Sequence, residues 1–202
     1  IVIWLSIAIV AGVPARFIAT PIVGVAVLLA AGFFIPGILK PYQKERLTSL
    51  FGGNEQRESY QATMARIAFG SGGVTGAGYL KGAQKKGGHI PDQHTDFIFT
   101  VVGEEGGFVG ATLVVLGFSF FFYRGWLVMV HCQDLFARLV AAGILGALAF
   151  HTVVNLYMNV QMLPVVGLWL PFFSYGGTAM WLCMASVAVL VNLRRHERGL
   201  LF

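Results

Sequence analysis

The chain has 202 residues, of which 56% are hydrophobic and only 11% are charged, and its net charge is a modest +5. A soluble domain usually carries about 25% charged residues, and a small globule has too much surface to bury this many apolar side chains. Composition therefore excludes an ordinary soluble domain and predicts an integral membrane protein. We expect no nucleic-acid partner.

Several apolar segments approach the length of about 20 residues that a membrane-spanning helix requires. In chain order they are Ile1–Val13, Phe17–Leu39, Gly107–Val130, Leu135–Met158 and Gly176–Leu193. Because the first begins inside an apolar run, we expect it to be the cut end of a span in a longer protein. Pro21 and Pro36 are predicted to bend the second.

The basic residues predict how these spans are oriented. By the positive-inside rule the tail Arg194–Arg198 faces the cytoplasm, and counting back places the loops 79–96 and 159–175 outside. The cluster at 40–46 is also best placed inside, which requires a short crossing within Tyr60–Gly78 that lines a cavity. We therefore predict an all-α integral membrane protein: one polytopic helix bundle with about six membrane crossings, one of them short and glycine-interrupted, and a large extracytoplasmic loop at 79–96.

The outward loop 79–96 departs from the positive-inside pattern, since it carries Lys81, Lys85 and Lys86 and no acidic residue before Asp92. Exposed lysines can simply solvate a loop. They can also form an anion site, and we favour this interpretation because basic side chains beside a bilayer attract phosphate groups. An outward-facing phosphate on a lipid indicates a lipid-linked diphosphate as the ligand.

His94, Thr95 and Asp96 lie just before a predicted span, where a charged side chain is expensive and usually functional. Asp96 could act as the N-cap of a helix that begins at Phe97. Capping alone does not explain His94 or the neighbouring lysines. The carboxylate of Asp96 could also act as a general base towards a sugar hydroxyl.

Other polar residues interrupt the apolar segments. Glu104 and Glu105 must pair with another group or face a polar pocket, and an ion pair with Arg66 and a place in a substrate cavity are both open. His151 and Asn155 share one helix face, four residues apart, and we expect both to hydrogen-bond across helices.

The outward loop at 163–177 combines prolines, aromatic residues and a glycine pair before the last span. Ser174, Gly176 and Gly177 suit a tight turn that opens a helix. The apolar and aromatic residues around them predict a re-entrant lid against the bilayer surface.

The sequence gives little support to metal or nucleotide sites. The spacing of His89, His94 and Asp96 matches no strong metal-ligand motif, so a Mg²⁺ ion held by the substrate's diphosphate is favoured over a dedicated protein site. There is no GxxxxGK[ST] loop, so ATP-driven transport finds no support. Cys132 and Cys183 are predicted not to form a disulfide.

The motifs described above resemble the SEDS family, the RodA and FtsW cell-wall polymerases. The resemblance rests on GSGG at 70–73, HTDFIF at 94–99, GEE at 103–105, the segment Pro164–Gly167 and LPFFSYGG at 170–177, with KPYQ at 40–43 and Asn155 with Met158 similar as well. Their order and spacing match from residue 40 through nearly the whole chain, so it resembles the C-terminal half of such a protein. The departures from the family's pattern are Met64, Ala65, Ala77, Asp92 and Gly106, and they leave a RodA-type or FtsW-type role open.

The resemblance implies a peptidoglycan glycosyltransferase of the bacterial cytoplasmic (inner) membrane, a multi-pass protein with its active site on the extracytoplasmic side. Such an enzyme polymerises lipid II into β-1,4 glycan for cell elongation or division, by inverting transfer that releases undecaprenyl diphosphate. Its usual partner is a class B penicillin-binding protein, a transpeptidase. The resemblance makes Asp96 catalytic, with His94 and Thr95 positioning the carboxylate. Substrate contacts are expected from Lys81, Gln84 and Lys85 at the diphosphate or sugars, and from Glu105 and Ser174 in the cavity.

Two alternatives come from other functional classes. A flippase or transporter of lipid-linked precursors often shows repeated halves, and no repeat is evident in this sequence. A non-catalytic scaffold for a transpeptidase is the other alternative.

Overall fold

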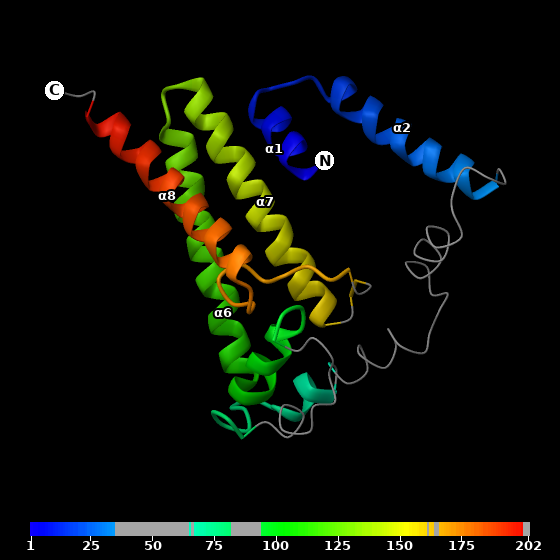
Figure 1. Cartoon of the computed structure of the whole chain (residues 1–202), viewed down its shortest axis with the longest axis vertical. Coiled ribbons are helices and arrows are strands. Elements are labelled where there is room, and N and C mark those ends of the chain that lie inside the picture. The colour runs from blue at the N-terminus through cyan, green and yellow to red at the C-terminus, as the bar shows by residue number, and fades with distance from the viewer. Residues whose placement is uncertain (35–64, 66, 82–93, 161, 164–165, 200–202) are drawn as a thin grey trace.

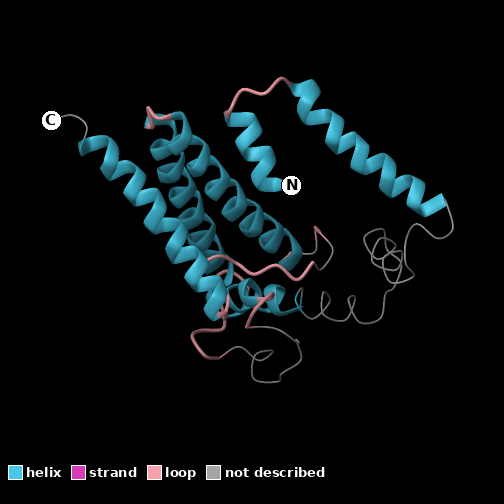
Figure 2. Cartoon of the chain, turned by 45° about the horizontal axis from the view of Figure 1, so that its top comes forward, coloured by secondary structure: helices cyan, strands magenta, loops and turns pink. Residues whose placement is uncertain are grey.

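The fold was analysed in a computed structural model, which describes residues 1–34, 65, 67–81, 94–160, 162–163 and 166–199. Its helices are α1 (Val2–Val10), α2 (Ala15–Phe34), α6 (Ile98–His131), α7 (Leu135–Asn159) and α8 (Gly177–Gly199), as Figure 1 shows. A short helical stretch also ends at Ser71. The described part of the chain contains helices and loops and no strand (Figure 2), in agreement with the all-α prediction.

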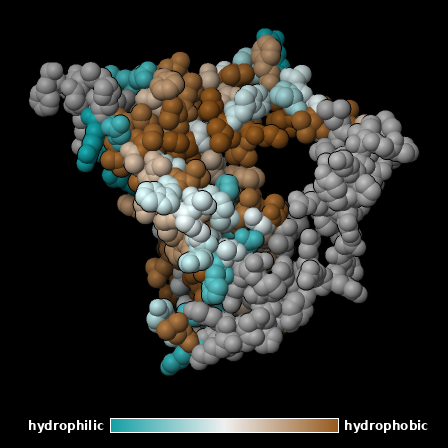
Figure 3. All heavy atoms as spheres, viewed as in Figure 1, coloured by the Kyte–Doolittle hydropathy of each residue, from teal (hydrophilic) through white to brown (hydrophobic). Residues whose placement is uncertain are grey.

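Among the described residues, three helices are long and apolar enough to cross a membrane: α6 with 34 residues, α7 with 25, and Gly177–Arg195 of α8. Apolar side chains cover much of the helical surface in the space-filling view (Figure 3). The predicted total of about six crossings is not established, because α1 has only 9 residues and residues 60–64 lie outside the described part. Pro21 lies inside α2, and Pro36 lies outside the described residues, so the predicted bends stay a prediction.

Helix α7 is the centre of the bundle. Its Ala141, Ala142 and Leu145 form an apolar cluster with Met129 of α6 and Leu190 of α8. On another face, α7 packs against α1, where side chains added at Gly143 and Gly146 would meet α1. Small residues at such contacts let helix backbones approach closely, and this close approach replaces the hydrophobic driving force that lipid does not supply.

The two ends of the bundle differ. The beginning of α6, the end of α7 and the beginning of α8 lie together at one end, and the α6–α7 connection and the C-terminus lie at the other (Figure 1). Asp134 caps α7 at that second end by accepting from the N–H groups of Phe136 and Ala137, both at 3.2 Å. Arg194 and Arg195 are near the end of α8, so the basic residues and the turn at 94–97 are at opposite ends of the bundle.

Candidate functional site

The turn at 94–97, which leads into α6, is held by the loop that precedes α8. The N–H of Tyr175 donates to the backbone oxygen of His94 at 2.9 Å. The hydroxyl of Ser174 donates to the backbone oxygen of Thr95 at 2.6 Å and accepts from the N–H of Leu170 at 2.7 Å. Ser174 is buried, so both of its hydrogen bonds are shielded from competing water. The loop and the turn therefore form one hydrogen-bonded unit.

The backbone oxygen of the next residue, Asp96, is held from the opposite side by α7. It accepts from the side-chain amide nitrogens of Asn155 at 2.8 Å and Asn159 at 3.1 Å. The Asn155 amide also donates to the backbone oxygen of Leu168 at 2.6 Å. Both asparagines are fully buried. Three successive carbonyls of the turn thus have partners from distant segments, which fixes the backbone that carries the Asp96 carboxylate.

The Asp96 side chain is partly exposed and lies beside Gly167. Gly167 has a φ of +69°, and a Cβ atom placed on it would be 3.3 Å from Asp96 Oδ2. The N-cap of α6 is Phe97, and the helix begins at Ile98. The alternative that Asp96 is the N-cap is therefore wrong by one residue, because the backbone of 94–97 forms a turn held by its neighbours instead of entering the helix directly.

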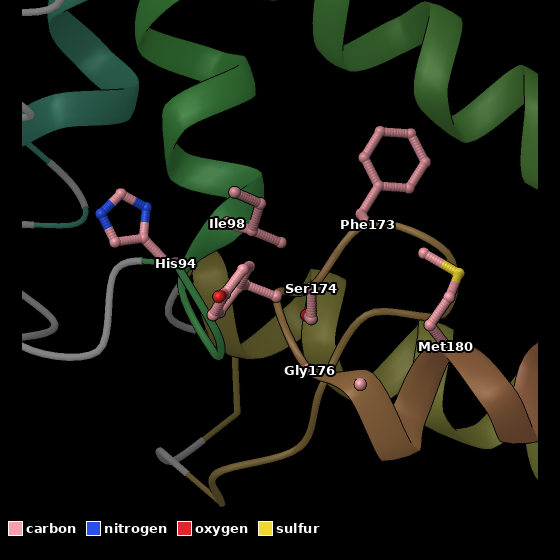
Figure 4. A pocket seen from close by; sticks show the side chains of 8 residues that line it. His94, Ile98, Phe173, Ser174, Gly176 and Met180 are labelled. Carbon is pink, nitrogen blue, oxygen red and sulfur yellow. The ribbon is translucent and has the colours of Figure 1, made fainter.

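A pocket of about 490 Å³ opens next to this turn. Figure 4 labels six of its lining residues: His94 and Ile98 from the turn and α6, Phe173, Ser174 and Gly176 from the loop, and Met180 from α8. His94 and Ser174 therefore line the same pocket. Gly177 opens α8, in keeping with the turn predicted there. Asp96, Lys81 and Glu105 do not line this pocket.

A second contact at this end joins the glycine-rich segment 72–78 to a break in α6. Gly107 has a φ of +61°, so the helix is interrupted there. In an unbroken helix the N–H groups of Phe108 and Val109 would donate to the carbonyls of Glu104 and Glu105. Here those two N–H groups donate to the backbone oxygens of Gly73 at 2.9 Å and Val74 at 3.1 Å.

The carbonyls left over at this break are satisfied by the same segment. Glu104 O accepts from Ala77 N at 2.9 Å, and Glu105 O accepts from Gly78 N at 3.1 Å. A Cβ atom on Gly76 or on Gly107 would overlap the backbone of the other chain segment, so the insertion requires glycine at both places. The described part of the predicted short crossing is thus packed into the break in α6.

The other residues predicted for the site either do not line this pocket or lie outside the described residues. Lys81 is exposed, the Glu105 side chain is half-buried, and Glu104 is only 1% exposed. Gln84 and Lys85, the other two predicted phosphate contacts, lie outside the described residues, as do Arg66 and His89. Among the residues described, no group of three His, Cys, Asp or Glu side chains could hold a metal ion. Cys132 and Cys183 are buried and not joined by a disulfide.

Asn155 bonds to distant segments, as expected of an amide in a span, but its partners are a turn and a loop and not another helix. Asn159 and Gly167 were not predicted as parts of the site. His151, on the same face, packs its ring against Trp169 with 4.5 Å between ring centroids. Asn159 follows Asn155 by four residues, so the signal for a second amide on that face was present in the sequence. The contact of Gly167 with Asp96 had no such signal, because it depends on how the loop folds.

Comparison with known proteins gives a match over residues 1–199 to the family described as cell cycle proteins and named for FtsW, RodA and SpoVE. The chain is 37% identical to the peptidoglycan glycosyltransferase RodA of Treponema pallidum over 79% of this chain and 37% of that protein. It is 35% identical to the peptidoglycan glycosyltransferase MrdB of Escherichia coli over 89% of this chain and 50% of that protein. The chain therefore spans half or less of the length of these curated relatives.

Two solved structures are also similar. One, from a study of how a peptidoglycan synthase complex coordinates polymerization and crosslinking, matches with a TM-score of 0.76 at 29% identity over 94% of this chain and 52% of the other. The second is an aspartate-to-alanine mutant of the rod shape determining protein RodA from Thermus thermophilus. It matches with a TM-score of 0.50 at 34% identity over 60% of this chain and 38% of the other.

Proposed function

This chain belongs to the FtsW/RodA/SpoVE family of cell cycle proteins, and we propose that it is the part of a peptidoglycan glycosyltransferase that carries the catalytic carboxylate. The reaction is polymerisation of lipid II into β-1,4 glycan strands on the outer face of the bacterial cytoplasmic membrane. The relatives named peptidoglycan glycosyltransferase support this reaction.

The single observation that carries the proposal is the fixed backbone of Asp96. Its carbonyl accepts from two buried amides, while the side chain remains partly exposed beside a pocket lined by His94 and Ser174. A general base must stand within hydrogen-bond reach of the proton that it removes, and a backbone held in this way keeps the carboxylate in place. The position at the end of the bundle opposite Arg194 and Arg195 supports an extracytoplasmic site.

In the proposed reaction, the Asp96 carboxylate accepts the proton of the 4-hydroxyl of the acceptor's GlcNAc. The freed oxygen forms a bond to the anomeric carbon of the donor's MurNAc from the face opposite the leaving group. The bond from that carbon to the phosphate oxygen breaks, and undecaprenyl diphosphate leaves with the electron pair. One displacement inverts the α-linked donor into a β-linked product.

In this proposal, other residues bind the substrate or hold the turn of Asp96. Lys81, with Gln84 and Lys85, attracts the diphosphate, since cationic side chains at a membrane surface concentrate phosphate groups. His94 and Thr95 belong to the turn that carries Asp96, Ser174 holds that turn, and Glu105 stays assigned to the substrate cavity. A divalent cation such as Mg²⁺ would be held by the diphosphate. The solved synthase complex supports a class B penicillin-binding protein as partner.

The test is Asp96→Asn in the intact protein, purified and supplied with lipid II. Glycan synthesis should fall by about 100-fold or more while lipid II binding is retained, because the amide keeps the shape and loses the base. Asp134→Asn is the matched control, since it makes the same change at the far end of α7, where Asn is also a good N-cap.

Other outcomes would contradict the proposed function or favour one of the alternatives. Unchanged synthesis by Asp96→Asn would remove this carboxylate from the mechanism. If the unsubstituted protein makes no glycan but stimulates a transpeptidase, the scaffold function would replace the enzyme. Movement of lipid II across vesicles without polymer formation would favour the transporter.

A further inference from the structure

A second hollow lies next to the pocket described above, on the apolar surface of α6. It has a volume of about 340 Å³, and its floor is a stripe of α6 residues four positions apart, Leu113, Gly117 and Phe121. Phe172 and Phe173 of the loop before α8 form its other wall. All of these side chains are apolar, so the hollow suits a hydrocarbon ligand. We call it the α6 groove.

The α6 groove adjoins the pocket at the candidate site through one residue. Phe173 lines both hollows, and its neighbour Ser174 lines the pocket and holds the turn of Asp96. Figure 4 shows the Phe173 ring extending from the loop away from His94 and Gly176. A molecule with a polar head beside His94 and a long apolar tail would therefore meet the groove as it passes Phe173.

The loop between the two hollows is shaped at an energetic cost. Phe172 has a φ of +65°, a conformation that costs about 1–3 kcal/mol for a residue other than glycine. It is held there by an edge-on contact with Phe121, with 5.4 Å between ring centroids. Phe173 packs in turn on Phe118 at 5.8 Å. Such strain persists only where the surroundings impose it, and here it places two aromatic side chains along one groove.

Gly117 leaves the floor of the groove open. A Cβ atom placed on it would have nothing within 4 Å, so the glycine is not required for packing against the helices that the structure describes. Glycine in a helix lowers its stability relative to alanine by about 1 kcal/mol. The absence of a side chain therefore needs another reason, and space for a ligand supplies one.

We propose that the α6 groove binds the polyprenyl chain of the lipid-linked donor, whose diphosphate and sugars lie at the candidate site. This inference rests on the proposed function and adds to it the place where the lipid tail is recognised. The shared wall at Phe173 favours the tail of the substrate itself over an unrelated phospholipid, because a molecule held at the pocket meets the groove directly at Phe173.

The test places a large side chain on the floor of the groove, at Gly117. Gly117→Leu and Gly117→Phe would be made in the intact protein and assayed for glycan synthesis with two synthetic donors. One donor carries the full undecaprenyl chain, and the other carries a chain cut to a few isoprene units, too short to pass Phe173. Val115→Phe is the control, since it adds an aromatic ring to an exposed position of α6 outside the groove.

We expect the Gly117 variants to raise the KM for the long-chain donor by about tenfold, the change that follows when one or two buried methylene groups lose contact. The KM for the short-chain donor should stay within about twofold of the unsubstituted value, as should both values for Val115→Phe. Because leucine favours helix more than glycine does, Gly117→Leu should not lower the thermal stability.

Three results would overturn the inference. Equal effects on both donors, or a loss of thermal stability in both Gly117 variants, would mean that a protein segment or an ordinary phospholipid fills the groove. No effect on either donor would mean that the groove binds nothing in the reaction. Lack of any polymerisation by the unsubstituted protein would instead defeat the proposed function, and this inference with it.

Discussion

Asn155 of α7 and Asp96 of the turn before α6 are 59 positions apart in the chain and are joined by a hydrogen bond of 2.8 Å from Nδ2 to the backbone oxygen. Because the same amide also donates to Leu168 O, one side chain sets the relative positions of a helix, a turn and a loop. The bond acts on the backbone oxygen of Asp96, so it fixes the position of the residue without using the carboxylate oxygens.

Replacing Asn155 by leucine should therefore damage both stability and glycan synthesis. The change keeps the volume and removes both donors, so the free energy of unfolding should fall by about 1–3 kcal/mol. Thermal unfolding in detergent and the rate of glycan synthesis would be measured on the same preparation of the intact protein.

The control for this change is Thr152→Val on the same helix. The Thr152 hydroxyl bonds only to Leu148 O of its own helix among the contacts seen, at 2.9 Å, so its loss should leave the turn in place. Similar rates for the two variants, compared at equal stability, would show that the amide does not position Asp96.

Ser174→Ala should lower kcat more than it changes KM. The hydroxyl joins Thr95 O to Leu170 N, and its removal takes away one of the hydrogen bonds that hold the turn of Asp96 to the loop. The bond from Tyr175 N to His94 O remains, so the loop and the turn keep one of their two links. We expect a drop of about tenfold in kcat, equivalent to about 1.4 kcal/mol of lost positioning. Ser186→Ala is the control, because that hydroxyl donates to Leu182 O of its own exposed helix surface. A pure rise in KM for Ser174→Ala would place Ser174 in substrate binding instead.

The spans and part of the site could be predicted because they depend on the type of side chain at each position, which the sequence shows directly. The predicted span Gly107–Val130 coincides with the part of α6 that lies beyond its break, since the apolar run begins there. Ser174 and the glycines after it were predicted as the turn that opens the last helix, and Gly177 begins α8. Asn155 was predicted as a cross-helix donor because an amide in an apolar segment needs a partner.

The insertion of the glycine-rich segment into α6 could not be predicted, because it is made by backbone groups. Every residue except proline carries the same N–H and C=O, so the sequence does not show that Phe108 N leaves its own helix to reach Gly73 O. The glycines indicate an irregular segment, which we predicted to be a membrane crossing. Its partner became visible only once the break at Gly107 was placed in space.

Because of that insertion, replacing Gly76 by alanine should change the stability of the protein much more than replacing Gly70. Gly76→Ala should destabilise the intact protein by about 1–3 kcal/mol or more, because Gly76 has a φ of +80° and a Cβ there would overlap the backbone at Glu105. Gly70→Ala should be neutral or stabilising, since a Cβ there has nothing within 4 Å and alanine favours the helix. Thermal unfolding of both variants would decide, and equal stabilities would argue against the insertion.

The most direct probe of the Asp96 carboxylate is Gly167→Ala. Gly167 has a φ of +69°, so alanine is strained there, and its Cβ would lie 3.3 Å from Asp96 Oδ2, close enough to push the carboxylate. Gly12→Ala provides the strain alone, because Gly12 has a φ of +72° and nothing within 4 Å of a built Cβ. Both variants should therefore lose about 1–2 kcal/mol of stability.

Only Gly167→Ala should also lose activity beyond its loss of stability. Because a displacement of about 1 Å at a reacting group can lower a rate by about 100-fold, we expect a fall in kcat of at least tenfold relative to Gly12→Ala. The measurement is kcat for glycan synthesis by the intact protein, at a temperature where both variants remain folded. Equal kcat values would mean that the loop beside Gly167 does not set the position of the carboxylate, and the role of Asp96 would then have to be independent of that loop.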